Sequence, residues 1–391
     1  MDIKTILIVI LMGWCNLAYS ENWFYGQARM SIDGADLDAV RELTIKNAIS
    51  DASYRAGATI SSEEIVLDGV LVGSKVILQT QGYLRRAEVL SEDISNGVLT
   101  VNVRADILVD EGCRKTKYGK RLLVSQFVLM DPKQAALGQL FDIGTHVTKR
   151  MQLQLNSHIE QLNAHLINQS FDLNDANSGF QWPELVRNSE YLEREYGHQY
   201  ALFGVIRDLS LFTQTKDKIF SKQTKTRRSF TIRIYLLDTF SQNIILEQSY
   251  HAEADWSFSL NDPVDLQSSL FWQSDFGMAI ANTLGNAAID IDDAIKCSKS
   301  YAQIIAPTDS GFIINLGASH GVQVGDILNL NKRVSEYSGR ILSKPYISHQ
   351  KDSEFKVISL NSETSVIYPV KIGASLSARV FDFMSSAEQK H

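Results

Sequence analysis

The sequence predicts a multidomain α+β protein. We expect a small α+β domain over residues 21–110, a mixed α/β domain over residues 111–298 and a small all-β, barrel-like domain over residues 299–391. The strongest observation is the run Tyr200–Ile206, which is apolar on both faces, as in a buried central strand. Helical apolar spacing precedes and follows this strand, whereas the last domain contains short apolar runs separated by turns.

The first residues predict a signal peptide over residues 1–20. Lys4 precedes an apolar run that ends at Trp14, and a small-residue pattern ending at Ser20 is typical of a cleavage site. The run is shorter than the roughly 20 residues that a membrane helix needs. Lipidation of Cys15 is disfavoured because the bulky Trp14 stands directly before it. We therefore expect export, with cleavage after Ser20.

The charge balance argues against a dedicated nucleic-acid binder. The chain has 38 Lys and Arg against 45 Asp and Glu, which gives a formal net charge of -7. Asp2 and Lys4 cancel, so loss of the signal peptide leaves this charge unchanged. The six prolines and the scarcity of low-complexity tracts argue against long disorder.

The first domain is expected to contain four elements in the order strand, helix, strand, strand. Their ranges are Trp23–Ser31, Leu37–Ala58, Val76–Leu90 and Val98–Leu108. The step from Asn96 to Gly97 favours a tight hairpin between the two long strands. The buried face of the helix is rich in small residues, so we expect it to pack closely on the sheet.

The middle domain is expected to mix strands and helices. Besides the central strand, strands are expected over Leu122–Met130, Ser229–Asp238 and Asn243–Asp255. Helices are expected over Thr145–Ile167, Trp182–Tyr196 and Met278–Cys297. In the last domain, Gly317, Gly321 and Gly325 mark a turn-rich connection between strands, where positive φ costs glycine least.

Cys113 and Cys297 are the two cysteines expected in the mature chain, and they lie near the ends of the middle domain. In an oxidising compartment, a disulfide between them is the favoured outcome. The alternative is two separately buried cysteines. A redox-active pair is disfavoured because their spacing is not the C-x-x-C spacing that lowers a thiol pKa.

Two basic clusters stand out in this acidic chain. The first lies in the connector before the middle domain and contains Arg114, Lys115, Lys117, Lys120 and Arg121. The second is expected on a hairpin and contains Lys216, Lys218, Lys222, Lys225, Arg227 and Arg228. The hairpin cluster has two interpretations: a charged edge that blocks unwanted strand pairing, or a docking surface for an acidic partner or an anionic envelope polymer.

No catalytic constellation of nucleophile, base and orienting group is evident. Ser319 fits a G-x-S-x-G pattern, but the following residues do not predict the helix that a nucleophile elbow requires. His251, Glu253 and Asp255 alternate along one predicted strand, which is typical of a solvated face more often than of a metal site. We expect no enzyme activity, no metal and no cofactor.

Five segments in the same order resemble the flagellar assembly protein T family. They are WFYGQA from Trp23, KNAISDASYRAGATIS from Lys46, GVLTVNVRADI from Gly97, GHQYALFGVIRDLS from Gly197 and GFIINLGASHGVQVGD from Gly311. The resemblance spans nearly the whole mature chain.

This resemblance implies a periplasmic structural component of the basal-body H ring, which surrounds the LP ring in polar, sodium-driven flagella. It implies self-association in a ring, assembly of the outer ring and support of the T ring of MotX and MotY, which helps to hold the stator for motility. It further implies a middle domain similar to the amino-terminal domain of TolB and no catalytic residues. The alternative is a periplasmic binding or scaffold module of another cell-envelope system.

Overall fold

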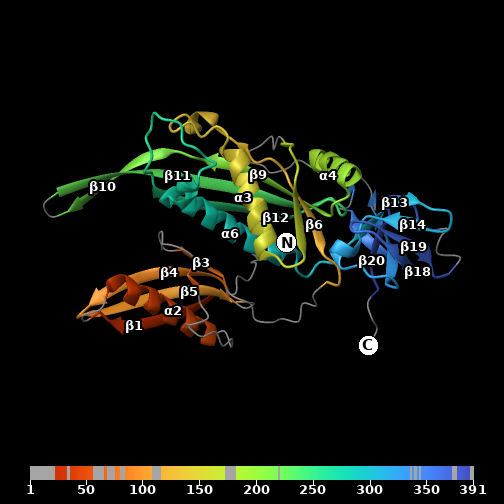
Figure 1. Ribbon diagram of the computed structural model, residues 1–391, viewed down its shortest axis with the longest axis horizontal. Coiled ribbons are helices and arrows are strands. Elements are labelled where there is room, and N and C mark those ends of the chain that lie inside the picture. The colour runs from red at the N-terminus through yellow and green to blue at the C-terminus, as the bar shows by residue number, and fades with distance from the viewer. Residues whose placement is uncertain are drawn as a thin grey trace, which may run out of the picture. The chain divides into compact units, whose positions relative to one another are not determined.

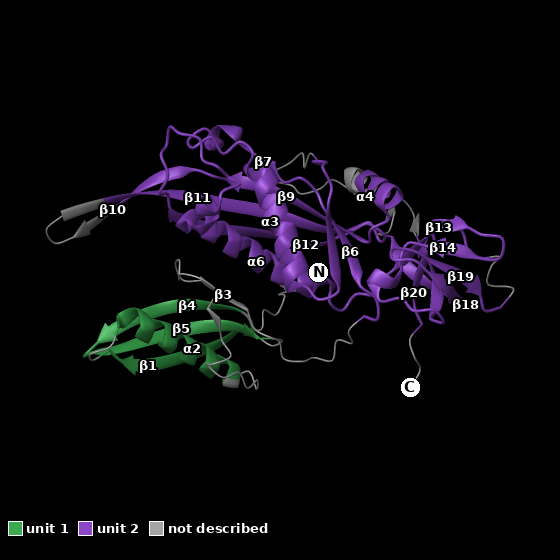
Figure 2. Ribbon diagram, viewed as in Figure 1, with its two compact units in different colours: residues 1–111 green, residues 112–391 purple. Residues whose placement is uncertain are grey.

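The computed structural model is a mixed α+β protein, and its chain separates into two compact units. It describes residues 23–32, 36–55, 66–67, 75–79, 84–107, 116–171, 182–218, 221–334, 337–338, 341–342, 345–371 and 377–387. Unit 1 spans residues 1–111 and unit 2 spans residues 112–391 (Figure 2). The predicted signal peptide lies outside the described residues. The predicted division into three domains stays a prediction, because the middle and last segments belong to one unit.

Unit 1 is a sheet covered by one helix. In chain order its elements are β1 (Trp23–Ser31), α2 (Leu37–Arg55), β2 (Val66–Leu67), β3 (Lys75–Gln79), β4 (Leu84–Ser95) and β5 (Val98–Ile107). The strand order is β1-β5-β4-β3-β2, and the pairs β1–β5, β4–β5 and β3–β4 are antiparallel. Asn96 and Gly97 have φ of 51° and 75° in the β4–β5 turn, as the hairpin prediction requires.

Helix α2 lies against the sheet through small residues. Ile45, Ala48 and Ala52 are fully buried, and Gly26 of β1 lies directly beneath them. A Cβ atom on Gly26 would lie 2.0 Å from the carbonyl oxygen of Ala48, so only glycine permits this approach. The predicted close packing of the helix is confirmed.

One prediction for unit 1 is wrong. The expected single strand Val76–Leu90 forms two strands, β3 and β4, which pair antiparallel with Lys75 opposite Glu88. The apolar pattern on both sides concealed this break.

The middle part of unit 2 is a mixed sheet with helices on both faces. Its strands are β6 (Lys120–Val124), β7 (Val128–Leu129), β8 (Leu162–Leu166), β9 (Tyr200–Asp208), β10 (Leu211–Lys218), β11 (Ser221–Asp238) and β12 (Asn243–Asp255). Its helices are η2 (Pro132–Ala135), α3 (Ile143–His158), α4 (Trp182–Tyr196), α5 (Ser269–Gln273) and α6 (Asp275–Ile295). The strand order is β10-β11-β9-β6-β8, with β12 beside β11 and β7 beside β9.

Strand β9 is the central strand, as predicted. It pairs in parallel with β6 and antiparallel with β11. Its Phe203 packs in a core cluster with Leu192 of α4 on one face of the sheet (Figure 1). On the other face, a Cβ on Gly204 would lie 2.6 Å from the ring of Phe127, whose backbone N–H donates to Thr148 of α3.

The predicted helix Thr145–Ile167 is wrong at its end. Helix α3 stops at His158, and Leu162–Leu166 forms the edge strand β8, parallel to β6. Gln161 adopts a positive φ of 60° in the turn between them. The segment after His158 is therefore stabilised by pairing with a strand 42 residues earlier, with Leu122 opposite Ala164.

The last part of unit 2 is a closed barrel. Its strands are β13 (Ala302–Pro307), β14 (Phe312–Ile314), β15 (Ile327–Val334), β18 (Tyr346–Leu360), β19 (Ser365–Pro369) and β20 (Phe383–Ser386), in the order β13-β14-β19-β18-β15-β20. Two short strands, β16 (Tyr337–Ser338) and β17 (Ile341–Leu342), pair separately. Gly321 and Gly325 have positive φ, whereas Gly317 does not; its missing Cβ leaves room for the carbonyl of Asn361.

Candidate functional site

Inside unit 2, a buried polar contact region fastens the barrel to the middle sheet. We define this joint by Tyr118 before β6, Glu193 and Gly197 at the end of α4, and Gln303, Asn315 and Arg333 of the barrel. Most of these polar groups are buried, and each makes a hydrogen bond or ion pair across the boundary between sheet and barrel.

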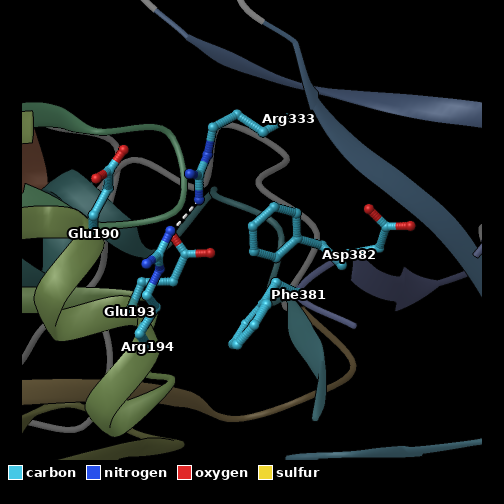
Figure 3. Close-up of a pocket in the computed structure, with 7 residues that line it drawn as sticks. Glu190, Glu193, Arg194, Arg333, Phe381 and Asp382 are labelled. Atoms are coloured by element: carbon cyan, nitrogen blue, oxygen red, sulfur yellow. Dashed lines mark hydrogen bonds and ion pairs between the residues drawn. The ribbon is translucent and has the colours of Figure 1, made fainter. Parts of the chain in front are cut away.

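Glu193 is the centre of the joint. Its carboxylate accepts a hydrogen bond of 2.9 Å from Nε2 of Gln303 and forms an ion pair with Arg333 (Figure 3). Burial raises the pKa of Glu193 more than the nearby Arg333 lowers it. The guanidinium of Arg333 also donates to the carbonyl of Phe240 at 2.7 Å and lies 5.5 Å from the ring of Phe383.

Gly197 contributes to the joint through its backbone carbonyl. Its φ is 62°, and its carbonyl oxygen accepts from Asn315 Nδ2 at 2.9 Å and from Arg121 Nη2 at 2.8 Å. A Cβ at this position would lie 2.5 Å from Asn315 Nδ2. Glycine is therefore needed twice, for the backbone conformation and for the approach of the barrel.

The connector before β6 is built into the barrel. Tyr118 is buried in the barrel core and donates to Asp326 Oδ2 at 2.9 Å, while Lys117 Nζ lies 2.6 Å from Asp326 Oδ1. Burial alone would raise the pKa of Asp326, but hydrogen bonds from Lys117, from the N–H of Gln323 and from Tyr118 lower it. The backbone N–H of Gly119 donates to the carbonyl of His320 at 2.9 Å.

The connector's basic residues are therefore not one exposed cluster. Lys120 and Arg121 are each 8% exposed, and burial lowers the pKa of Lys120 to about 8 and that of Arg121 to about 10. Arg114 and Lys115 lie outside the described residues. Nearby in the sequence, Lys117 pairs with Asp326 and Arg121 donates to the carbonyl of Gly197, so both make contacts of the joint.

His198 and His320 lie near Arg121 at the edge of the joint, and His165 lies beside His198. The His165 and His198 rings lie 5.1 Å apart edge to face, and His320 is 3% exposed. Burial and then the charge of Arg121 lower the pKa of His320 to about 4 and that of His198 to about 3. His198 and His320 are therefore neutral at neutral pH.

The joint contains a cavity of about 180 Å³, lined by Glu190, Glu193, Arg194, Arg333, Phe381, Asp382 and Phe383 (Figure 3). This volume is below the roughly 300–1,000 Å³ of most small-molecule sites. Its central charges, on Glu193 and Arg333, already neutralise each other. The arrangement fits a structural contact better than a binding site.

Ser319 is not arranged as a nucleophile. It lies in a single 3-10 turn, η3 (Ala318–His320), and its hydroxyl lies 2.7 Å from Glu363 Oε1 and 2.8 Å from the carbonyl of Ser362. Nδ1 of His320 accepts the N–H of Gly317 and lies 3.3 Å from the Ser319 hydroxyl, while Nε2 of His320 lies 3.6 Å from Glu363 Oε2. Because Nδ1 is already engaged and the Ser319 hydroxyl is directed to Glu363 and to the carbonyl of Ser362, these side chains are not ordered as nucleophile, base and orienting group. As the sequence predicts, no helix follows this turn, because the next element is β15.

The predicted docking cluster lies on the hairpin formed by β10 and β11. Residues of β11 before Arg227 pair only with β10 among the described strands, so this hairpin extends beyond the rest of the sheet (Figure 1). Lys216, Lys218 and Lys222 occupy its outer part, but their side chains are not among those described. Lys225 forms an ion pair with Asp255.

Arg227 is likewise paired with β12. Its guanidinium lies 3.4 Å from Glu253 and 3.6 Å from Asp255, and it stacks 5.8 Å from the ring of Phe212. The neighbouring carboxylates of β12 therefore offset part of the positive charge of the cluster. The docking interpretation stays a prediction.

Arg228 does not belong to an exposed surface. Its side chain is fully buried and lies 4.2 Å from the Trp256 ring. It donates to the carbonyls of Leu209, Gln134 and Leu137 at 3.1, 3.1 and 2.7 Å. Because successive strand residues face opposite sides, Arg227 points to one face and Arg228 to the other. Arg228 therefore anchors the base of the hairpin.

His251, Glu253 and Asp255 share one face of β12, as predicted, and they bind neighbouring side chains. His251 contacts Thr231 at 2.8 Å, and the two carboxylates pair with Arg227 and Lys225. Among the described residues, no group of three His, Cys, Asp or Glu side chains is arranged to hold a metal ion.

Cys297 follows the end of α6 and is held in a disulfide bond. Cys113 lies outside the described residues, so its pairing with Cys297 stays a prediction. No helix in the described part of the chain is both long enough and apolar enough to cross a membrane.

Two family models match the chain. Residues 23–109 match the model described as flagellar assembly protein T, N-terminal domain, and residues 111–266 match the model described as flagellar assembly protein T, middle domain. Together they cover more than half of the sequence. A search of curated proteins gave no match.

Several solved structures show a distant likeness. Hypothetical protein CT253 from Chlamydia trachomatis is 11% identical over 46% of this chain and 98% of its own, with a TM-score of 0.31. The PelC dodecamer from Paraburkholderia phytofirmans is 7% identical over 47% and 91%, with a TM-score of 0.25. TolB from Acinetobacter baumannii is 11% identical over 73% and 63%, with a TM-score of 0.20. At these TM-scores the likeness carries no argument.

Proposed function

Since this chain belongs to the flagellar assembly protein T family, we propose that it is a periplasmic structural component of the basal-body H ring. Its broader role in flagellar assembly follows from the family. The ring role, in a polar and sodium-driven flagellum, is the finer proposal. In it, copies of the chain associate around the LP ring, permit assembly of the outer ring and support the T ring of MotX and MotY.

The observation that carries a mechanical role is the joint. A protein that resists motor torque must transmit force between its parts without bending. Here buried charge-assisted hydrogen bonds link helix α4 to the barrel through Glu193, Gln303 and Arg333. Breaking such bonds costs more free energy than breaking exposed contacts. The buried Tyr118 adds a core contact. Unit 2 therefore suits a rigid bracket.

Two further features belong to this proposal. A disulfide between Cys113 and Cys297 would hold the ends of the middle segment together. The basic hairpin, with Lys216, Lys218 and Lys222 in its outer part, would contact an acidic partner in the basal body. We propose no catalytic step, because the joint, the turn around Ser319 and the hairpin offer none.

The role is tested by deleting the gene and examining purified basal bodies by electron microscopy. We expect deletion to remove the outer ring and to impair swimming, and expression of the intact chain to restore both. Intact rings and normal swimming after deletion would contradict the ring role.

The hairpin is tested separately by a chain with Lys218→Glu and Lys222→Glu. We expect reduced recovery of this chain in purified basal bodies, with normal amounts in the periplasm. Lys371→Glu is the matched control, because its side chain is 69% exposed on the barrel. Equal recovery of the hairpin variant and the control would show that the hairpin is not part of the docking surface. That result would not contradict the ring role.

A further inference from the structure

A groove separate from the joint and the hairpin lies along helix α3. It has a volume of about 730 Å³, within the range of sites that bind ligands or peptide segments. One wall is α3 and the other is the segment around α5. The lining residues are Asp142, Thr145, His146, Lys149, Arg150, Leu153, Leu266, Gln267 and Trp272.

The helical wall is one continuous face. The six lining residues from Asp142 to Leu153 recur at i, i+3, i+4, i+7, i+8 and i+11, so they lie along one side of α3 and its N-cap. The opposite side contains Val147, Met151 and Leu155, which are fully buried in the core. The groove face is therefore held in place by the packing behind it.

Arg150 is the distinctive cation of this groove. Its guanidinium lies 5.3 Å from the ring of Trp272, whose Nε1 donates to the carbonyl of Leu266 at 3.0 Å and so fixes the indole. Nε of Arg150 is shielded from solvent and has no hydrogen-bond partner among the described residues. The rest of the Arg150 side chain is partly exposed, so an incoming carboxylate can pair with its guanidinium, the partner that arginine favours most.

The remaining lining combines positive charge with apolar surface. Lys149 and Arg150 outnumber the single carboxylate, Asp142. Leu153 is 52% exposed, and Phe141, next to Asp142 in the chain, is 58% exposed. Such exposed apolar side chains beside cations mark a surface for an acidic segment that also carries apolar side chains.

We propose that this groove docks an acidic, partly apolar segment of a partner protein. A carboxylate of the partner binds the guanidinium of Arg150 in its stacked position on Trp272, and a second carboxylate lies near Lys149. Apolar side chains of the partner cover Leu153 and the exposed edge of Trp272. This inference goes beyond the proposed ring role, because neither the joint nor the hairpin takes part.

The test uses the full mature chain and a fluorescein-labelled peptide of about ten residues in which Glu alternates with Leu and Phe. Fluorescence anisotropy should show saturable binding that weakens at least about tenfold with Arg150→Gln and with Trp272→Ala. A peptide with Lys in place of Glu should not bind measurably. Arg150→Lys should bind more weakly than the native chain, because it keeps the charge but loses the planar fork.

Lys371→Gln is the control, since it removes an exposed cation far along the chain, and it should bind as the native chain does. Thermal unfolding confirms that each variant is folded. Equal binding of the Lys peptide, or unchanged binding by Arg150→Gln in a folded chain, would overturn the proposal. Absence of saturable binding by the native chain would overturn it as well. The assay needs no flagellum, so its failure is distinct from failure of the ring role.

Discussion

At the scale of single residues, Arg228 shows how a cation can be structural. The buried guanidinium donates to three carbonyls, so its removal leaves all three carbonyls without this donor. We expect Arg228→Met to lower the free energy of unfolding of unit 2 by about 3 kcal/mol. Urea unfolding followed by circular dichroism measures this change.

Arg227→Met is the matched control for that prediction. Arg227 is partly exposed, and its carboxylate partners stay hydrated when it is lost, so the expected cost is below about 1 kcal/mol. Equal losses for the two variants would show that the Arg228 side chain does not anchor the hairpin.

His320 makes the stability of unit 2 depend on pH. Its pKa is about 4 in the folded chain and about 6.5 when unfolded, so below pH 6.5 the unfolded chain binds the additional proton. Stability should therefore fall as the pH decreases from 6.5 to 4. In His320→Asn, the asparagine oxygen can still accept the N–H of Gly317, but the residue no longer titrates.

We expect His320→Asn to take up about one proton fewer on unfolding in this pH range. Unfolding free energies measured at several pH values give the proton uptake. His198 should make a similar contribution, because its folded pKa of about 3 is also depressed by burial. An identical pH dependence in the native chain and His320→Asn would contradict this account.

Predictions for single residues succeeded where the interacting residues are adjacent in the chain. The turn at Asn96 and Gly97 follows from two adjacent residue types. Arg228 was misassigned because its acceptors come from positions 134, 137 and 209, and composition alone does not reveal a buried cation. The joint was missed for the same reason: Glu193 and Arg333 are 140 positions apart.

At the scale of elements, the contact between α2 and β1 depends on Gly26. A Cβ there would lie 2.0 Å from Ala48 O and 2.6 Å from Ala52 N, both backbone atoms that cannot move aside cheaply. We expect Gly26→Ala to destabilise unit 1 by about 1–3 kcal/mol, the cost of overpacking. Differential scanning calorimetry should show a lower transition temperature for unit 1 alone.

Gly325→Ala is the comparison for Gly26→Ala. No atom lies within 4 Å of the added Cβ, so the cost is only that of a positive φ of 93°, about 1 kcal/mol. It should affect unit 2 and leave unit 1 unchanged. A shift of both transitions by either substitution would contradict independent units.

Elements were predictable where one periodicity dominated. Strand β9 is apolar on both faces and was located correctly. Strand β8 was assigned to a helix because its five residues follow α3 closely and no local signal marks a parallel partner. Its identity comes from β6, which lies about 40 positions earlier.

At the scale of the whole molecule, the joint should make the sheet and barrel of unit 2 unfold together. Glu193 and Arg333 form a largely buried pair, with side chains 6% and 23% exposed, and removing one partner leaves the other charge poorly solvated. A double-mutant cycle with Glu193→Ala and Arg333→Ala should give a coupling of more than about 1 kcal/mol. The pair Lys371 and Asp352, 3.9 Å apart and mostly exposed, should give a coupling near zero.

The same cycle tests whether the joint transmits force. In the native chain, amide hydrogens of β9 and of β15 should exchange with the same free energy, because opening either requires breaking the joint. In the double variant, β15 should exchange at a lower free energy than β9, since the barrel can then open alone. Earlier exchange of the barrel in the native chain would mean that sheet and barrel move independently, and a hinge between them could not serve as a rigid bracket.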